Sequence, residues 1–415
     1  MQFKKFIFAS ALFTVLFFAA ASPMEPVAVL SIRDLSDFIQ KTSQYAAAGN
    51  PKDGAQTALL LNFFLMSPQV ASLDTRKPIT GYLYFAEPAL QPVLFGSLRN
   101  GINPVEIPFL PGQNLVPEVR GSTVVYYDKE FARTALSLDR NAIPVPDGEL
   151  SGVYFFRGTF PDSESDDEMN TELAHLISTE LSKITFSAGY PQRNLLRIQL
   201  EMEANKDGDL VGFSNMERPA LKEMVQILPE SRSYTYMELP ANMTIANGIS
   251  VFHSVFAEEF LDLEHIYGQF LNTVISGTHD TALAVSRSQD FFLFSGILPE
   301  GTLRLNFETF LKDNGESYDG KTFVFHKPDG VDIFLRINGN IANLLIKTTD
   351  GKPESLDPVF RSLQNGKIPM QGREFLISLL RKNDGTYERQ AVGTMSNGKF
   401  HLELNLYPQI LRLIK

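Results

Sequence analysis

The stretch LRIQLEM, residues 196–202, decides the fold class. Its apolar residues stand at every second position and alternate with Arg, Gln and Glu. This period of two is typical of a half-buried strand, because successive side chains of a strand point to opposite faces of the sheet. The stretch therefore predicts an antiparallel sheet. The sequence NKDGD, residues 205–209, follows directly and predicts a hairpin turn.

Similar turn signals recur along the chain, and amphipathic helices are interleaved with them. Helical spacing predicts one helix that ends at Gly49, a second over about 53–66 and a third that reaches Ile184. Within the second helix, Ala58 to Met66 forms an apolar run interrupted only by Asn62, and we expect this run to be buried. The proline-rich stretch 99–121 shows no periodicity and predicts a long loop, either a lid or a connector. The other turn signals are Lys327–Gly330, Asp350-Gly351, Asn383–Gly385 and Asn397-Gly398.

These elements predict an α+β fold with two similar halves, each a mainly antiparallel sheet of hairpins packed against amphipathic helices. The paired strands expected at 81–98 and at 281–298 lie roughly 200 residues apart, which suggests a tandem duplication. The expected organisation is a signal peptide at 1–21, a first α+β domain at 22–240 and a second at 241–415. A competing boundary is the proline-rich linker at 143–146.

The N-terminus has the three parts of a secretory signal peptide. Lys4 and Lys5 precede the apolar run Phe6–Phe18, and Ala19–Ala21 offers small residues for cleavage after Ala21. The alternative is an uncleaved anchor, but the run is shorter than the roughly 20 residues that cross a bilayer. We therefore expect an exported protein, periplasmic or extracellular, with no transmembrane segment in the mature chain.

Composition excludes several classes of function. The formal charge is −11 and there is no basic block, so binding to nucleic acid by charge is not expected. There is no cysteine, which excludes disulfides, a lipoprotein anchor, thiolate metal sites and cysteine nucleophiles. Phenylalanine is abundant, at 33 residues, and is expected to fill cores or to line an apolar cavity.

One cluster of side chains suits metal binding. Glu258, Asp262 and His265 stand four and three residues apart on an expected helix, so they would share one face. The same spacing arises on any solvated acidic face, and Glu259 and Glu264 make that reading the stronger one. No catalytic, cofactor or metal-binding residue is therefore assigned. Nucleotide-binding glycine motifs and the serine hydrolase elbow are also absent.

Two short motifs carry a resemblance. The sequence LDTRKP at 73–78 leads into the strand expected from Ile79, and LPA at 239–241 stands where the second half would begin. In this pattern the chain resembles a loose class of uncharacterised exported two-domain bacterial proteins of unknown function. Lys77 is inserted relative to the class pattern. The resemblance implies a two-domain exported protein and assigns no catalytic residue.

Three functions remain as hypotheses. The leading one is a non-enzymatic binding or scaffold protein of the periplasm or cell surface, with an unknown protein as its partner. The second is a carrier of a lipid or another apolar small molecule in a phenylalanine-lined cavity. The third is a hydrolase with a dispersed active site that uses Glu258, Asp262 and His265.

Overall fold

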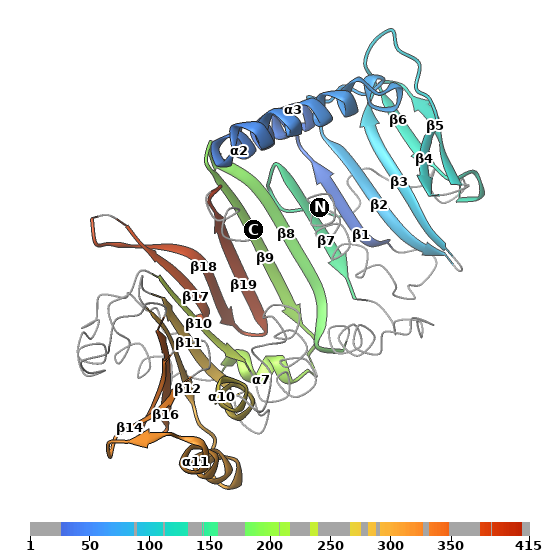
Figure 1. The fold of residues 1–415 in the computed structure, drawn as a ribbon. Coiled ribbons are helices and arrows are strands. Elements are labelled where there is room, and N and C mark those ends of the chain that lie inside the picture. The colour runs from blue at the N-terminus through green and yellow to red at the C-terminus, as the bar shows by residue number, and fades with distance from the viewer. Residues whose placement is uncertain are drawn as a thin grey trace. The chain divides into compact units, whose positions relative to one another are not determined.

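The fold of the 415-residue chain is given by a computed structural model. The chain forms two compact units, unit 1 with residues 1–208 and 399–415, and unit 2 with residues 209–398. Figure 1 labels helices and strands of both units. The structure describes residues 26–86, 89–110, 113–131, 143, 145–156, 179–206, 208–215, 233–239, 266–274, 281–287, 291–326, 332–347, 374–382 and 384–408.

Unit 1 is built on an antiparallel run of strands with the first strand in its interior. From one end to the other, the pairing order is β4, β5, β6, β3, β2, β1, β7, β8, β9, β19. The strands are β1 (Pro26–Ile32), β2 (Ile79–Ala86), β3 (Ala89–Ser97), β4 (Ile107–Leu110), β5 (Gln113–Arg120), β6 (Thr123–Tyr127), β7 (Leu150–Phe155), β8 (Leu181–Gln192), β9 (Leu195–Ala204) and β19 (Lys399–Leu406).

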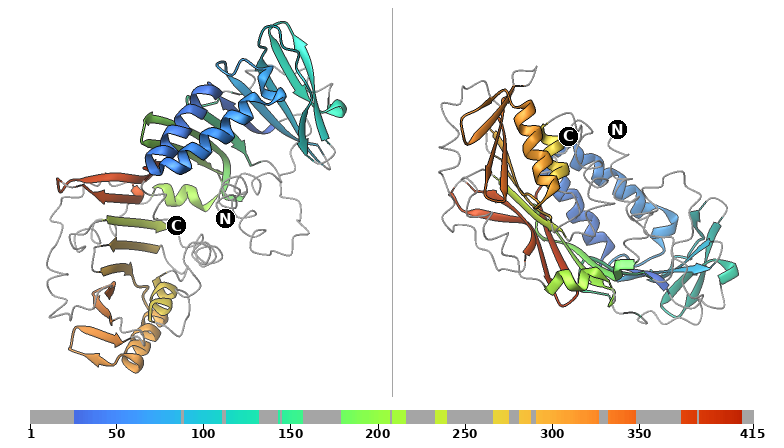
Figure 2. Two further views of the ribbon diagram at one scale, coloured as in Figure 1. Left: turned by 45° about the horizontal axis from the view of Figure 1, so that its top comes forward. Right: turned by 90° about the horizontal axis from the view of Figure 1, so that it is seen from below.

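Two helices lie side by side on the sheet of unit 1 (Figure 2). They are α2 (Leu35–Gly49) and α3 (Pro51–Met66), followed by the short α4 (Pro68–Ala71), while the single-turn η1 (Lys129–Phe131) follows β6. Helix α2 crosses the sheet: its first turns pack near Ile32 and Ile79, and at its other end the Tyr45 hydroxyl donates to the Leu406 carbonyl at 3.1 Å. The helix therefore ties the C-terminal strand β19 to the N-terminal part of the chain.

Unit 2 contains a second antiparallel run and two packed helices. The pairing order is β13, β14, β15, β16, β12, β11, β10, β17, β18. Its elements are α7 (Asp209–Asn215), β10 (Ser233–Leu239), α10 (Ile266–Val274), β11 (Thr281–Arg287), β12 (Phe291–Ile297), α11 (Thr302–Asn314), β13 (Ser317–Tyr318), β14 (Thr322–His326), β15 (Asp332–Asn338), β16 (Ile341–Lys347), β17 (Glu374–Arg381) and β18 (Tyr387–Ser396).

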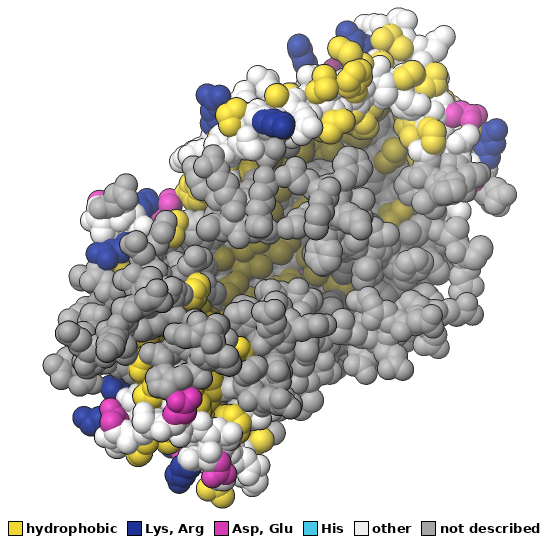
Figure 3. All heavy atoms as spheres, in the orientation of Figure 1, with side chains coloured by type: hydrophobic (Ala, Val, Ile, Leu, Met, Phe, Trp, Pro, Cys, Tyr) yellow, Lys and Arg dark blue, Asp and Glu magenta, His cyan; other side chains and the backbone are white. Residues whose placement is uncertain are grey.

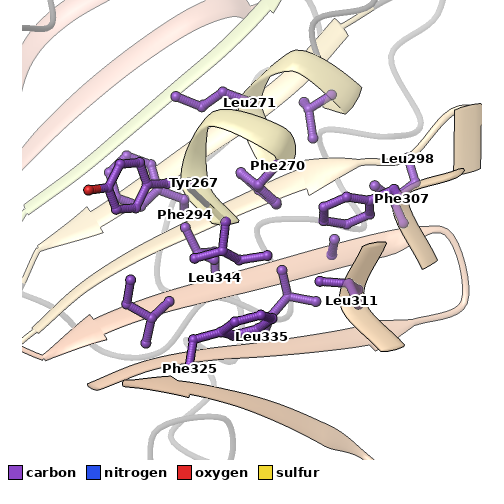
Figure 4. Close-up of a cluster of buried hydrophobic side chains, with 14 of the residues drawn as sticks. Tyr267, Phe270, Leu271, Phe294, Leu298, Phe307, Leu311, Phe325, Leu335 and Leu344 are labelled. Atoms are coloured by element: carbon purple, nitrogen blue, oxygen red, sulfur yellow. The ribbon is translucent and has the colours of Figure 1, made fainter. Parts of the chain in front are cut away.

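The core of unit 2 lies between its helices and one face of its sheet (Figure 4). Phe270 from α10 and Phe307 from α11 meet with ring centroids 6.4 Å apart, and both side chains are buried. Leu335 and Leu344 enter the same cluster from β15 and β16. Aromatic and aliphatic burial of this kind is the main stabilising contribution to a domain without disulfides.

The predicted fold class is wrong. In place of two α+β halves with a sheet each, the strands of the described chain belong to one large antiparallel sheet of 19 strands with few helices. One reason is visible in unit 1, where β19 pairs with β9 in an unbroken register from Lys399–Glu203 to Leu406–Leu196. Alternation within a strand shows that the strand has two faces, but it does not show which strand will lie at its edge.

The boundary predicted near Leu239-Pro240 falls at the end of β10, and Pro240 lies outside the described residues. The domain bounds of 22–240 and 241–415 therefore stay a prediction. The signal peptide and its cleavage site also lie outside the described residues.

Several local predictions are confirmed and several are wrong. Residues 196–202 form part of β9, and Asn397-Gly398 forms a tight turn with φ of 53° and 74°, as a two-residue hairpin requires. The turn at 205–209 is no hairpin, because α7 begins at Asp209. Ile184 belongs to strand β8 and not to a helix. The stretch 99–121 is no long loop, since it contains β4 and β5.

Candidate docking surface

The most unusual surface of the described chain lies on α3. Its side chains Leu59, Leu60, Phe63, Phe64 and Met66 are 58%, 58%, 65%, 50% and 78% exposed. We call these five residues the α3 apolar face. In the space-filling view, hydrophobic side chains gather along the upper edge, where Figure 1 places α3 (Figure 3). The expectation that Ala58–Met66 is a buried helix is therefore wrong.

Local sequence explains why α3 begins and ends where it does. The Asn50 side chain accepts a hydrogen bond from the Lys52 amide at 3.0 Å, and Pro51 occupies the first turn, where its missing N–H is not needed. The helix ends at Met66, and the Ser67 amide donates to the Phe64 carbonyl at 3.1 Å. Hydrogen bonds thus cap both ends of the helix.

A close helix crossing sets the orientation of α3. A Cβ atom added to Gly54 would lie 2.4 Å from the Cα of Ala47 in α2, which is closer than real Cβ atoms come. Glycine therefore lets the two helices approach at this point. On the side of α3 that faces inward, Leu61 and Leu65 pack against the cluster of Leu35, Ile39 and Val70. The α3 apolar face is what remains on the outer side.

The exposed residues form a broad band. Spacings of four and three place Leu59, Phe63 and Met66 in one row, and Leu60 and Phe64 lie in the adjoining row. Their combined exposed area is on the order of 600 Å², which reaches the upper end of the largest apolar patches on ordinary monomers. No charged residue occurs from Gly54 to Leu73, although 20% of the whole chain is charged. Patches of this size commonly mark interaction sites.

A second candidate is a row of buried polar side chains on the sheet of unit 2. The Ser295 hydroxyl donates to Asn343 Oδ1 at 2.6 Å, and Arg336 donates to the Thr322 hydroxyl at 2.9 Å. Among the described residues, Ser286 Oγ and Asn343 Nδ2 have no hydrogen-bond partner. An amide oxygen is not basic enough to take a proton from serine, so Ser295 is not activated as a nucleophile by this contact.

Two buried groups of β10 complete the polar side of unit 2. The Tyr236 hydroxyl donates to Glu238 Oε2 at 2.7 Å, and both side chains are buried. In the neighbouring strand β17, the buried Glu374 carboxylate lies 3.9 Å from the guanidinium of Arg389 in β18. These contacts satisfy buried charge and hydrogen-bonding groups, which is what a stable interior requires.

The predicted metal cluster of Glu258, Asp262 and His265 lies outside the described residues. Within the residues that are described, no three acidic or histidine side chains come together in a way that would hold a metal ion. His401 lies on β19, half exposed, with its Nδ1 atom 3.4 Å from Glu201 Oε2.

The α3 apolar face was missed because eight of the nine residues in Ala58–Met66 are apolar. A helix that is apolar all round shows no preferred face, and burial is its usual reading. The sequence signal that could have revealed the face is the uncharged run 54–73. This run is longer than the apolar stretch that a helix with one buried face requires.

None of the helices in the described chain has the length and apolarity to cross a bilayer.

Comparisons with known proteins add little to this geometry. No family model matches the chain, and no relative is found among curated proteins. Among solved structures, the chain is compared with the beta subunit from DNA polymerase of Streptococcus pyogenes. That alignment has 9% identity, covers 92% of this chain and 88% of that chain, and has a TM-score of 0.09. A likeness of this level supports no statement about fold or function.

Proposed function

We propose that the protein is a non-enzymatic binding or scaffold protein, and that it contacts its partner through the α3 apolar face. The observation that carries this proposal is the set of five large apolar side chains that α3 holds in solvent. Exposure of this area is unfavourable by roughly 25 cal/mol per Å². Covering it with a partner recovers that free energy, so the face is suited to association.

The rigid mounting of α3 supports the proposal. Both ends of the helix are capped, and Gly54 fixes it against α2. A helix whose backbone is already ordered loses little backbone entropy on binding, and the interaction therefore keeps more of its favourable free energy. The charge of −11 and the lack of any charge from Gly54 to Leu73 support a partner other than nucleic acid.

The proposed place of action is outside the cytoplasm. The signal peptide at 1–21, with cleavage after Ala21, supports this, and cleavage would remove Lys4 and Lys5 and change the formal charge from −11 to −13. N-terminal sequencing of the exported protein should begin at Ser22. An intact Met1 in a cytoplasmic fraction would contradict export.

Site-specific photo-cross-linking in the native cells tests the binding function. A benzophenone amino acid in place of Phe63 should give a covalent adduct of higher mass. The matched control is Leu305 on α11, because the two side chains are 65% and 63% exposed. We expect adducts from position 63 and none from position 305. Absence of any adduct at position 63 would contradict the proposal.

No observation in the described residues favours the other two functions. Among the described phenylalanines of unit 2, Phe270 and Phe307 pack against each other and are buried in the core. A lipid that co-purifies in native mass spectrometry would favour the carrier. Turnover in a broad hydrolase screen, lost on a point mutation, would favour the enzyme.

A further inference from the structure

We propose that the partner of the α3 apolar face is a second copy of this chain, so that two α3 helices pack antiparallel across a two-fold axis. This inference rests on the proposed function, since the same face makes the contact. Three properties of the face carry it, namely its charge, its geometry and its area.

The lack of charge on the α3 apolar face favours contact between two copies of the chain at this face. Two copies with a formal charge of −11 each repel one another at long range. Along residues 54–73 there is no charge, so two copies can meet there without bringing like charges into contact. A membrane surface is a poorer occupant, because the exposed side of α3 between Leu59 and Met66 carries no Lys or Arg to bind anionic lipid.

The geometry of the face suits a two-fold contact. In an isologous interface each residue pair occurs twice, so one surface must be complementary to itself. The row of Leu59, Phe63 and Met66 and the adjoining row of Leu60 and Phe64 form ridges with a groove between them. Ridges of one helix can enter the groove of the other, and an antiparallel arrangement also opposes the two helix dipoles favourably. Phe63 lies nearest the middle of the face and hence nearest the proposed axis.

The area is sufficient for a dimer of moderate affinity. If each copy contributes on the order of 600 Å², the two together bury about 1,200 Å², which is the lower limit of stable protein interfaces. Interfaces near this limit are commonly weak or transient, so we expect a dissociation constant on the order of micromolar.

The absence of cysteine provides a direct test. In the variant Phe63→Cys, the single thiol can form a disulfide only with another copy. Under mild oxidation we expect a covalent dimer from Phe63→Cys and none from the control Leu305→Cys, which places the thiol on an equally exposed helical site of unit 2. Formation of dimer by both variants at equal rates would reflect random collision and would overturn the proposal.

Sedimentation velocity of the purified chain at about 1 to 100 µM gives the second measurement. The wild-type chain should sediment as a dimer, and Phe63→Glu should weaken association by roughly 100-fold or more, because an unpaired carboxylate would be buried at the centre of the contact. Leu305→Glu should leave the dimer intact. Circular dichroism shows whether each variant is folded.

The outcomes separate this inference from the function on which it rests. A wild-type chain that stays monomeric, together with cross-links from position 63 to another protein in cells, overturns the dimer and leaves the binding function standing. A monomeric chain without any cross-link from position 63 overturns both. A monomeric chain that binds vesicles of neutral lipid assigns the face to a membrane and overturns the dimer.

Discussion

Helix α3 of unit 1 and helices α10 and α11 of unit 2 differ in how far they bury their apolar side chains. In unit 2, α10 buries seven of its nine residues, and α11 buries Phe307 and Leu311. In unit 1, eight of the nine α3 residues from Ala58 to Met66 are apolar, yet the helix exposes Phe63 and its neighbours. In both units the first strand lies inside the sheet, β1 between β2 and β7, and β10 between β11 and β17. The difference therefore lies in the helices.

The comparison teaches that the apolar content of a helix does not determine its burial. Helices α10 and α11 face a common core to which β15 and β16 contribute Leu335 and Leu344. Helix α3 packs on α2 and toward the cluster around Val70, and its other side faces solvent. A helix in such an outer layer needs a partner to cover its second side, which is the basis of both proposals above.

The largest expected effect is a difference in the free energy of unfolding between alanine substitutions at two phenylalanines, one in each unit. Phe270→Ala removes a fully buried ring from unit 2 and should lower the free energy of unfolding by about 3–5 kcal/mol. Phe63→Ala removes a ring that is 65% exposed and should change it by less than about 1 kcal/mol. Urea unfolding of dilute protein measures both. Equal losses from the two variants would mean that α3 is buried in solution, and the comparison would fail.

A smaller effect is expected at two helical glycines. Gly54→Ala should destabilise unit 1 by about 1–3 kcal/mol, because the new methyl group would meet Ala47. Gly212→Ala, in α7 of unit 2, has nothing within 4 Å of the added atom and should stabilise by about 0.5–1 kcal/mol. Thermal unfolding of both variants checks the signs. If Gly54→Ala is as well tolerated as Gly212→Ala, the close crossing of α2 and α3 is not what orients the face.

The smallest effect concerns alkaline pH. Burial raises the pKa of Tyr45 to about 12, with a further contribution from Tyr190. In the unfolded chain tyrosine ionises near pH 10. The contribution of Tyr45 to the free energy of unfolding is therefore complete below that pH and is lost as the pH rises to about 12. Burial also raises the pKa values of Tyr84 and Tyr154 in the same unit.

Tyr45→Phe should therefore flatten the loss of stability between about pH 10 and 12, while at neutral pH it should lower stability by about 1 kcal/mol through loss of the hydrogen bond to Leu406. Urea unfolding at several pH values measures the difference from wild type. The control is Tyr318→Phe in unit 2, whose side chain is 58% exposed. An unchanged alkaline profile in Tyr45→Phe would show that the contact between α2 and β19 is not maintained in solution.

Much of the local structure was predictable. The alternation at 196–202 predicted β9, the paired strands expected at 81–98 correspond to β2 and β3, and spacing predicted α2 and α3. These signals are local, since periodicity records which faces of an element differ in polarity. Ile184 was misassigned because apolar residues spaced by three and four can also occur in a strand with both faces half buried, as in β8.

The candidate site was not predictable in the same way. Nothing in the run Ala58–Met66 distinguishes a helix buried on all sides from one in an outer layer. The buried polar row of unit 2 depends on the register of β12 with β16, which sets Ser295 opposite Asn343 across 48 residues of sequence. Neither residue stands in a motif, so sequence reasoning had no signal there.

By itself, the sequence determined the antiparallel strand character, the absence of thiol chemistry and the uncharged run from Gly54 to Leu73. These follow from side-chain chemistry and from spacing along the chain. Only the tertiary structure decided that β19 pairs with β9 and does not belong to a separate second sheet. It also decided that the apolar side chains of α3 between Leu59 and Met66 are exposed to solvent. The physical reason is that edge pairing and burial depend on which distant elements arrive as neighbours, and a local pattern does not carry that information.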